Sequence, residues 1–136
     1  MTGKCPFIAI ALCLAVLVSP AARAADKKPA AEARLYEETV AKAIEYCRTQ
    51  GQAADGSYSA EAGPAVTAIV TAGILRSGRT PDDPLVAKSL KYLEGFVHPD
   101  GGIYPAKSRH RNYETCVALQ CFNEANRDKR YDALIK

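Results

Sequence analysis

The sequence resembles itself at an offset of 45 to 48 residues, and this self-similarity constrains the fold more than any other feature. Three segments recur in this way: 43–47 corresponds to 89–93, Asp55-Gly56 to Asp100-Gly101, and Thr67 to Thr115. A period of this length with two helices per unit is typical of α-hairpin repeats. One hairpin of this kind cannot bury its own apolar faces, so the units are expected to stack.

Apolar residues follow helical spacing in four segments, and no segment alternates with period two for long enough to predict a strand. We therefore predict an all-α chain of antiparallel α-hairpins. The expected helices cover about 30–50, 64–77, 84–97 and 112–125, with a fifth beginning at 130. Asp83 and Asn112 are expected N-caps. Two apolar faces are predicted to be buried, Val66, Ile69, Val70, Gly73 and Ile74 in the second helix and Val117, Ala118, Cys121, Phe122 and Ala125 in the fourth.

Residues 1–24 have the pattern of an export signal. Lys4 gives a positive start, residues 7–18 are apolar, and Ala22-Arg23-Ala24 has the form that signal peptidase cuts, here after Ala24. The apolar run is too short to span a bilayer, so we predict a secreted or periplasmic protein with no membrane attachment after cleavage. The alternative is that residues 1–24 stay attached as an anchor. Residues 25–31 are read as a polar spacer, and residues 32–136 as two hairpin units and part of a third, about 32–78, 79–127 and 128–136.

Charge and cysteine content narrow the function classes. Without residues 1–24 the chain has 16 basic and 15 acidic side chains, and this near-neutral balance argues against a nucleic-acid partner. The remaining cysteines are Cys47, Cys116 and Cys121, which we interpret as small unpaired residues of the core.

Two loop motifs resemble a known family. Residues 52–58, with Gln52, Asp55, Gly56 and Tyr58, resemble the Gln-x-x-Asp-Gly-x-Trp repeat of squalene and hopene cyclases. Residues 99–102, with Asp100, Gly101 and Gly102 and followed by Tyr104, resemble the Pro-Asp-Gly-Gly turn of protein prenyltransferase β-subunits. The resemblance covers about residues 40–136 and implies part of an α/α toroid, in which outer helices lead through the motif into inner helices. Tyr58 and Tyr104 stand in place of Trp, and Val97 in place of Gln. The motif itself has a structural role, since glycine permits a positive φ and the carboxylate binds nearby backbone groups.

The same resemblance directs attention to three sites. The cyclases use an Asp-x-Asp-Asp acid, and the nearest string here, Thr80-Pro81-Asp82-Asp83, is better explained by helix capping. The transferases hold a diphosphate with a basic loop, which implies Lys107, Arg109, His110 and Arg111 as anion-binding candidates; the alternative is a solvated loop. Their zinc pair implies Glu114 and Cys116, for which the alternative is a carboxylate favoured by the helix dipole and a core cysteine.

Two functions remain open at this point. The first is an exported relative of isoprenoid cyclases and transferases, whose family binds an isoprenoid or other apolar ligand in a central cavity. The second is a non-catalytic repeat module that binds a protein or glycan partner. We assign no catalytic residue and no cofactor. The chain is expected to be a fragment or truncated member of the family, completed by further repeats or by self-association.

Overall fold

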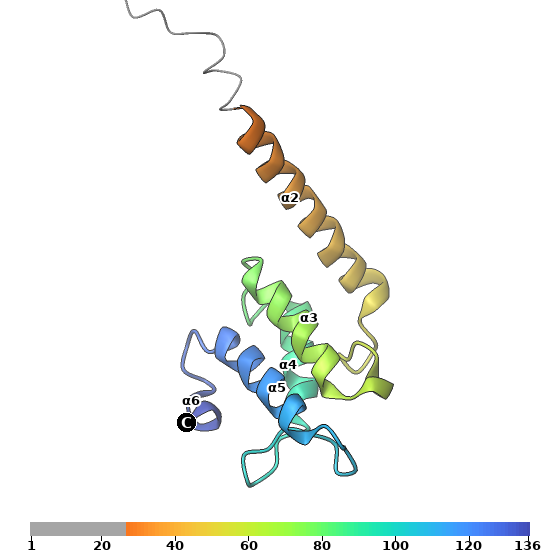
Figure 1. Ribbon diagram of the computed structural model, residues 1–136, viewed down its shortest axis with the longest axis vertical. Helices are drawn as coiled ribbons and strands as arrows, with labels where there is room; N and C mark the ends of the chain where they lie inside the picture. The colour runs from red at the N-terminus through yellow and green to blue at the C-terminus, as the bar shows by residue number, and fades with distance from the viewer. Residues whose placement is uncertain (1–26) are drawn as a thin grey trace, which may run out of the picture. The chain divides into compact units, whose positions relative to one another are not determined.

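The computed structural model describes residues 27–136, and side chains from residue 29 onward. The chain divides into two units, Met1–Tyr36 and Glu37–Lys136. The helices are α2 (Lys27–Tyr46), α3 (Pro64–Arg76), α4 (Pro84–Glu94), α5 (Arg111–Ala125) and α6 (Asp132–Ile135) (Figure 1). The described residues contain no strand beyond an isolated antiparallel bridge between Val97 and Ile103. The all-α prediction is confirmed.

The predicted export signal and the cleavage position Ala24 lie outside the described residues. Within the described part, no helix is long and apolar enough to cross a membrane.

Helix α2 begins earlier than the sequence pattern predicted. It starts at Lys27, so most of the predicted spacer at 25–31 is helical. Pro29 falls in the first turn, where its missing N–H costs nothing, and the following alanines favour helix. The helix ends at Tyr46 and continues as one π-helical turn, Cys47–Gly51. In the second unit, Ile44 is buried in the core.

Helices α3 and α5 lie side by side and run in the same direction. At their N-terminal ends, the carboxylate of Glu114 lies against Gly63. At their C-terminal ends, Arg76 and Glu124 form an ion pair of 2.8 Å. Small residues line both buried faces and let the helices approach closely; they are Ala65, Ala68 and Ala72 on α3, and Ala118, Cys121 and Ala125 on α5.

The buried face of α3 differs from the predicted one. Ile69 is 50% exposed, whereas Thr67 and Thr71 are fully buried. The reason is that both threonine hydroxyls find hydrogen-bond partners, Thr71 with the carbonyl of Thr67 and Thr67 with the backbone of Tyr58. A hydroxyl that is hydrogen-bonded can be buried at little cost, so polarity alone did not identify the buried face.

Helix α4 begins as the sequence predicted. The side chain of Asp83 accepts a hydrogen bond from the backbone N–H of Leu85 at 3.0 Å, which is an N-cap. The helix ends at Glu94, so the predicted extension to Val97 is wrong, and Val97 instead forms the bridge to Ile103.

Helix α5 begins at Arg111 with His110 as its N-cap residue, so the prediction that Asn112 is the N-cap is wrong. Asn112 lies inside the first turn. The predicted buried face is largely confirmed, with Ala118, Cys121, Phe122 and Ala125 buried.

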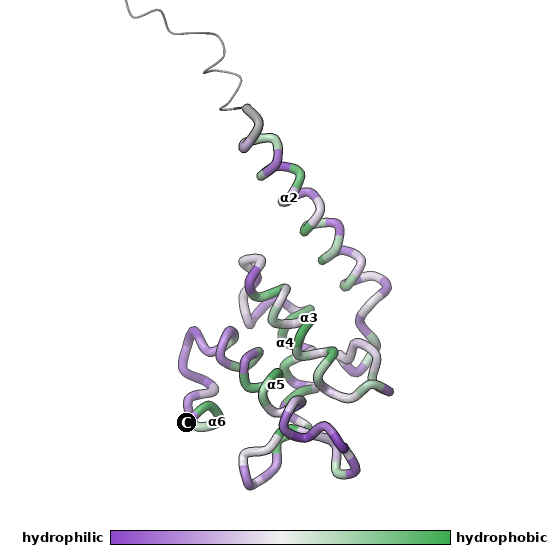
Figure 2. Tube along the Cα trace, viewed as in Figure 1, coloured by the Kyte–Doolittle hydropathy of each residue, from purple (hydrophilic) through white to green (hydrophobic). Residues whose placement is uncertain are grey.

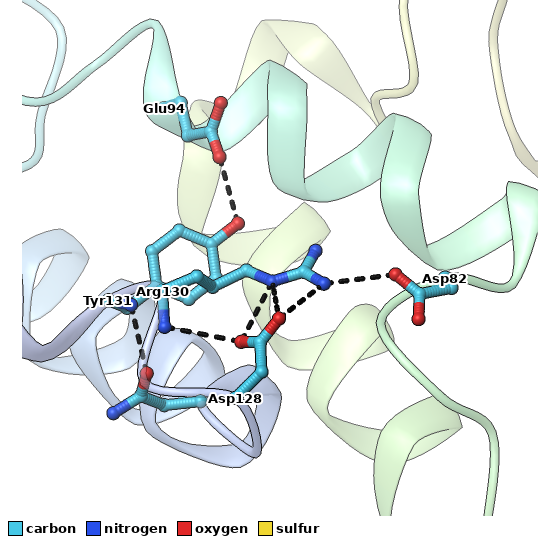
Figure 3. A network of polar contacts seen from close by, with 6 residues as sticks. Asp82, Glu94, Asp128, Arg130 and Tyr131 are labelled. Atoms are coloured by element: carbon cyan, nitrogen blue, oxygen red, sulfur yellow. Dashed lines mark hydrogen bonds and ion pairs between the residues drawn. The ribbon is translucent and has the colours of Figure 1, made fainter.

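The C-terminal segment forms a short helix and packs through Tyr131. The ring centroids of Tyr131 and Phe122 lie 4.6 Å apart. The Tyr131 hydroxyl donates a hydrogen bond to the carboxylate of Glu94 at 2.8 Å. Figure 3 shows this contact beside the ion pairs of Arg130 with Asp82 and Asp128. The segment is therefore tied to both ends of α4.

Candidate functional site

The first motif loop is an Asp-Gly turn held by its own side chains. Asp55 Oδ1 accepts hydrogen bonds from the backbone N–H of Ser57 at 3.0 Å and from its hydroxyl at 2.6 Å. These bonds lower the pKa of Asp55. Gly56 has φ +96°, a conformation that favours glycine.

The second motif loop repeats this geometry. Asp100 Oδ1 accepts from the backbone N–H of Gly102 at 3.0 Å, which lowers the pKa of Asp100, and Gly101 has φ +82°. The backbone donor therefore lies two residues after the aspartate in both loops.

Each loop is joined to the following helix by a threonine. The hydroxyl of Thr67 accepts from the backbone N–H of Tyr58 at 2.9 Å, and that of Thr115 accepts from the backbone N–H of Ile103 at 3.0 Å. By these bonds Tyr58 corresponds to Ile103, so the alignment of Tyr58 with Tyr104 is wrong by one residue. The two tyrosines were aligned because Tyr58 lies three residues after Asp55 and Tyr104 lies four residues after Asp100.

The two tyrosines accordingly have different surroundings. Tyr58 is 6% exposed, and burial raises its pKa to about 12. Tyr104 is half-buried, stacks on His98 with ring centroids 4.3 Å apart, and donates its hydroxyl to Asp100 at 3.2 Å. Of the two tyrosines, only Tyr58 is a buried aromatic residue of its loop.

The first loop is also bonded to α4. The amide of Gln52 donates to the carbonyl of Leu85 and to the hydroxyl of Ser89, both at 2.8 Å, and Ser89 donates to the carbonyl of Gly56 at 2.8 Å. A Cβ on Gly56 would lie 2.3 Å from the carbonyl oxygen of Lys88. Gln52 and Gly56 belong to the predicted loop motif, whereas Ser89 lies outside it and was not predicted. The signal for Ser89 is a polar residue within the apolar stripe of α4.

The basic loop before α5 is hydrophilic (Figure 2), but its cations do not act as one group. Lys107 and Arg109 are exposed. Arg111 is held back on the loop itself: its guanidinium lies 5.0 Å from the ring centroid of Tyr104 and donates to the carbonyls of Ala106 and Ser108. Arg109 and Arg111 line a pocket of about 360 Å³, and a neighbouring pocket is lined by Lys107 together with Arg109 but not by Arg111. The structure thus keeps Lys107 and Arg109 as candidates for binding an anion and gives Arg111 a structural role.

Glu114 and Cys116 are not brought together. Residues that are two positions apart in sequence, such as these, lie about 200° apart around a helix. Glu114 is 5% exposed and lines a pocket beside Gly63, whereas Cys116 is exposed and lines a pocket beside Asp100 and Tyr104. The interpretation of Cys116 as a core residue is therefore wrong. Among residues 27–136 no group of three His, Cys, Asp or Glu side chains could hold a metal ion.

The three cysteines of the described chain are free thiols in different environments. Cys121 is fully buried, and burial raises its pKa to about 12. Cys47 is half-buried, and burial raises its pKa as well.

Asp82 and Asp83 both have structural partners. Asp83 caps α4, as predicted. Asp82 is exposed and forms an ion pair of 2.9 Å with Arg130. Neither carboxyl has the burial that a strong protonating acid would need.

Comparison of the chain with models of protein families, with curated proteins and with solved structures gives no match.

Proposed function

We propose that the chain is an exported protein built of prenyltransferase/squalene cyclase-type repeats, and that its stacked hairpins bind an isoprenoid or other apolar ligand. The observation that carries the proposal is the equivalence of the two motif loops. Each has an aspartate that binds the N–H two residues on, a glycine at positive φ, and a threonine hydroxyl from the next helix on the loop backbone.

Stacking of hairpins is supported by the contacts of the first loop. Gln52 and Gly56 bind the helix that begins the following hairpin, through Leu85, Ser89 and Lys88. At the second loop, a Cβ on Gly101 would meet no atom within 4 Å. In this proposal, a further repeat or a second copy of the chain occupies that side of Gly101.

The ligand-binding face is assigned to α3, which would be an inner helix of a toroid. Val66, Ile69, Val70 and Gly73 lie at helical spacing on one side of α3. Val66 and Val70 are half-buried and pack against the core, whereas Ile69 and Gly73 are exposed. Ile69 is half-exposed, and a Cβ on Gly73 would meet no atom within 4 Å. An apolar ligand would cover this face and remove it from water.

Acid-catalysed cyclisation is not assigned to this chain, because Asp82 and Asp83 are used in an ion pair and a helix cap. The alternative function is a module that binds a protein or glycan partner. It is favoured by Tyr113, which is 55% exposed beside the basic loop, since exposed aromatics next to polar groups are frequent in binding surfaces.

The test is a titration of the purified protein with farnesol, followed by calorimetry. We expect saturable binding that Ile69→Asp weakens about tenfold, because a charge is placed against an apolar ligand. Tyr46→Asp is the matched control, since Tyr46 is also exposed but lies on α2. Absence of farnesol binding, or equal binding by both variants, would contradict the apolar-ligand proposal.

Export is tested separately. The gene is expressed with its N-terminal segment, and the protein recovered outside the cytoplasm is sequenced from its N-terminus. We expect Ala25 as the first residue; a product that keeps residues 1–24 would support the anchor alternative instead.

A further inference from the structure

Glu114 is a buried carboxylate without a partner. Its side chain is 5% exposed, and its Oε2 atom is buried without any hydrogen bond. The ion pairs found among the described residues do not include it. Burying such a group is unfavourable unless something binds it, so the position calls for a partner that supplies hydrogen-bond donors or positive charge.

The carboxylate lies at the wall of an open pocket of about 500 Å³. One side of the pocket is formed by residues 60–63, just before α3, and the other by residues 105–110, just before α5. Gly63 leaves room for the carboxylate, because a Cβ there would lie 2.8 Å from Glu114 Oε1. The glycine also has φ +82°, so a larger residue is doubly disfavoured.

The outer wall of the pocket has the opposite charge. Lys107 and Arg109 are cationic and exposed and line it beside His110, and no ion pair or hydrogen bond ties the side chain of Lys107 or Arg109 to another described residue. The N-termini of α3 and α5, which favour negative charge, adjoin the same pocket. On the facing side, Glu61 is exposed to solvent. The pocket therefore combines a buried anion with a cationic entrance.

This arrangement does not suit a simple ion. An inorganic anion would pair with Lys107 and Arg109 but would be repelled by the carboxylate of Glu114. A metal ion would find only two carboxylates, those of Glu114 and Glu61, and no group of three metal-binding side chains exists among residues 27–136. A molecule with a positive group at one end and a negative group at the other satisfies both parts.

We propose that the pocket between residues 60–63 and 105–114 binds a small zwitterion, an amino acid whose ammonium group pairs with Glu114 and whose carboxylate faces Lys107 and Arg109. Joining both groups in one molecule makes the second contact intramolecular, so the zwitterion binds more tightly than either half alone. This site is separate from the apolar face of α3, and either proposal can fail without the other.

The experiment titrates the purified protein with glycine, β-alanine, 4-aminobutyrate and 6-aminohexanoate, and with methylammonium and acetate as the two halves. Binding is followed by the amide NMR signals of Gly63 and Ser108. We expect one chain length to bind about tenfold more tightly than either half. Glu114→Gln and Arg109→Gln should each weaken that binding about tenfold, and Glu45→Gln, an exposed carboxylate on α2, should leave it unchanged.

Three results would overturn the proposal. Acetate that binds as tightly as the amino acids, with no effect of Glu114→Gln, would show a plain anion site. Methylammonium that binds equally well, with no effect of Arg109→Gln, would show a plain cation site. Absence of saturable shifts would leave Glu114 only as a charge beside the N-terminus of α3. If Glu114→Gln does not fold, the variants Arg109→Gln and Lys107→Gln still test the proposal, because both residues are exposed and their substitution leaves the core intact.

Discussion

Gly56 lies so close to Lys88 that a Cβ on the glycine would be 2.3 Å from the lysine carbonyl oxygen. The motif glycine therefore serves two purposes at once. It adopts a positive φ, and it lets the loop contact the backbone of α4. Gly101 also has a positive φ, but a Cβ built there would meet no atom within 4 Å. Comparing the two glycines therefore separates the cost of a positive φ from the cost of a steric clash.

Gly56→Ala and Gly101→Ala should consequently differ. We expect Gly101→Ala to lower the free energy of unfolding by about 1 kcal/mol, the cost of a positive φ in a residue with a side chain. Gly56→Ala adds a steric clash with α4 and should cost about 3 kcal/mol. Urea unfolding followed by circular dichroism measures both, and equal losses would contradict the close contact.

The two threonines that bind the motif loops, Thr67 on α3 and Thr115 on α5, should make similar contributions to stability. Thr67→Val removes the acceptor for the backbone N–H of Tyr58, and Thr115→Val removes the acceptor for that of Ile103. Each should cost about 1–3 kcal/mol of unfolding free energy, because a donor loses its partner. Thr71→Val is the matched control, since Thr71 only donates to a carbonyl of its own helix, and it should cost about 0.5 kcal/mol or less. If Thr115→Val were as mild as this control, the equivalence of the two loops would lose its support.

The network that holds the C-terminal segment contains one partly buried bond and several exposed ion pairs. Tyr131→Phe removes the hydroxyl that donates to Glu94 and should lower the unfolding free energy by about 1 kcal/mol. Arg130→Ala removes exposed ion pairs with Asp82 and Asp128 and should have an effect within about 0.5 kcal/mol. Thermal unfolding of the two variants tests this order, and a larger loss for Arg130→Ala would reverse it.

Stability should fall in alkaline solution because of Cys121. Its pKa is raised by burial from 9.0 to about 12 in the folded chain, so the thiol keeps its proton when the unfolded chain has lost it. The stabilising contribution is complete below pH 9 and is lost as the pH rises from 9 to about 12, by at most about 1.4 kcal/mol per pH unit. Tyr58, with a pKa raised to about 12, acts in the same direction at the upper end of this range.

The measurement is the unfolding free energy at a series of pH values from 8 to 11, for the natural chain and for Cys121→Ala. The variant is less stable throughout, since a buried side chain is shortened, but its stability should fall less steeply between pH 9 and 10. Parallel pH profiles would show that Cys121 is not the titrating group.

Local sequence signals were enough to predict that the chain is helical and where two of its helices begin. Periodic apolar residues, Pro64 and Pro84 at the first helical positions, and Asp83 as a cap predicted where α3 and α4 begin, because these signals act within one turn of the chain. The Asp-Gly turns were also predictable, since the aspartate and the glycine fix their conformation through bonds over two residues.

Which helix faces are buried, and which distant residues come into contact, depends on how the helices pack together. Thr67 is fully buried and Ile69 half-exposed because a hydroxyl from α3 bonds the preceding loop, a contact that hydropathy cannot show. Glu114 and Cys116 look like a pair in the sequence, yet the helix turns them to different pockets. The pocket beside Glu114 exists because α3 and α5 run in parallel and bring Gly63 against the first turn of α5, and that proximity between residues about 50 positions apart comes from packing alone.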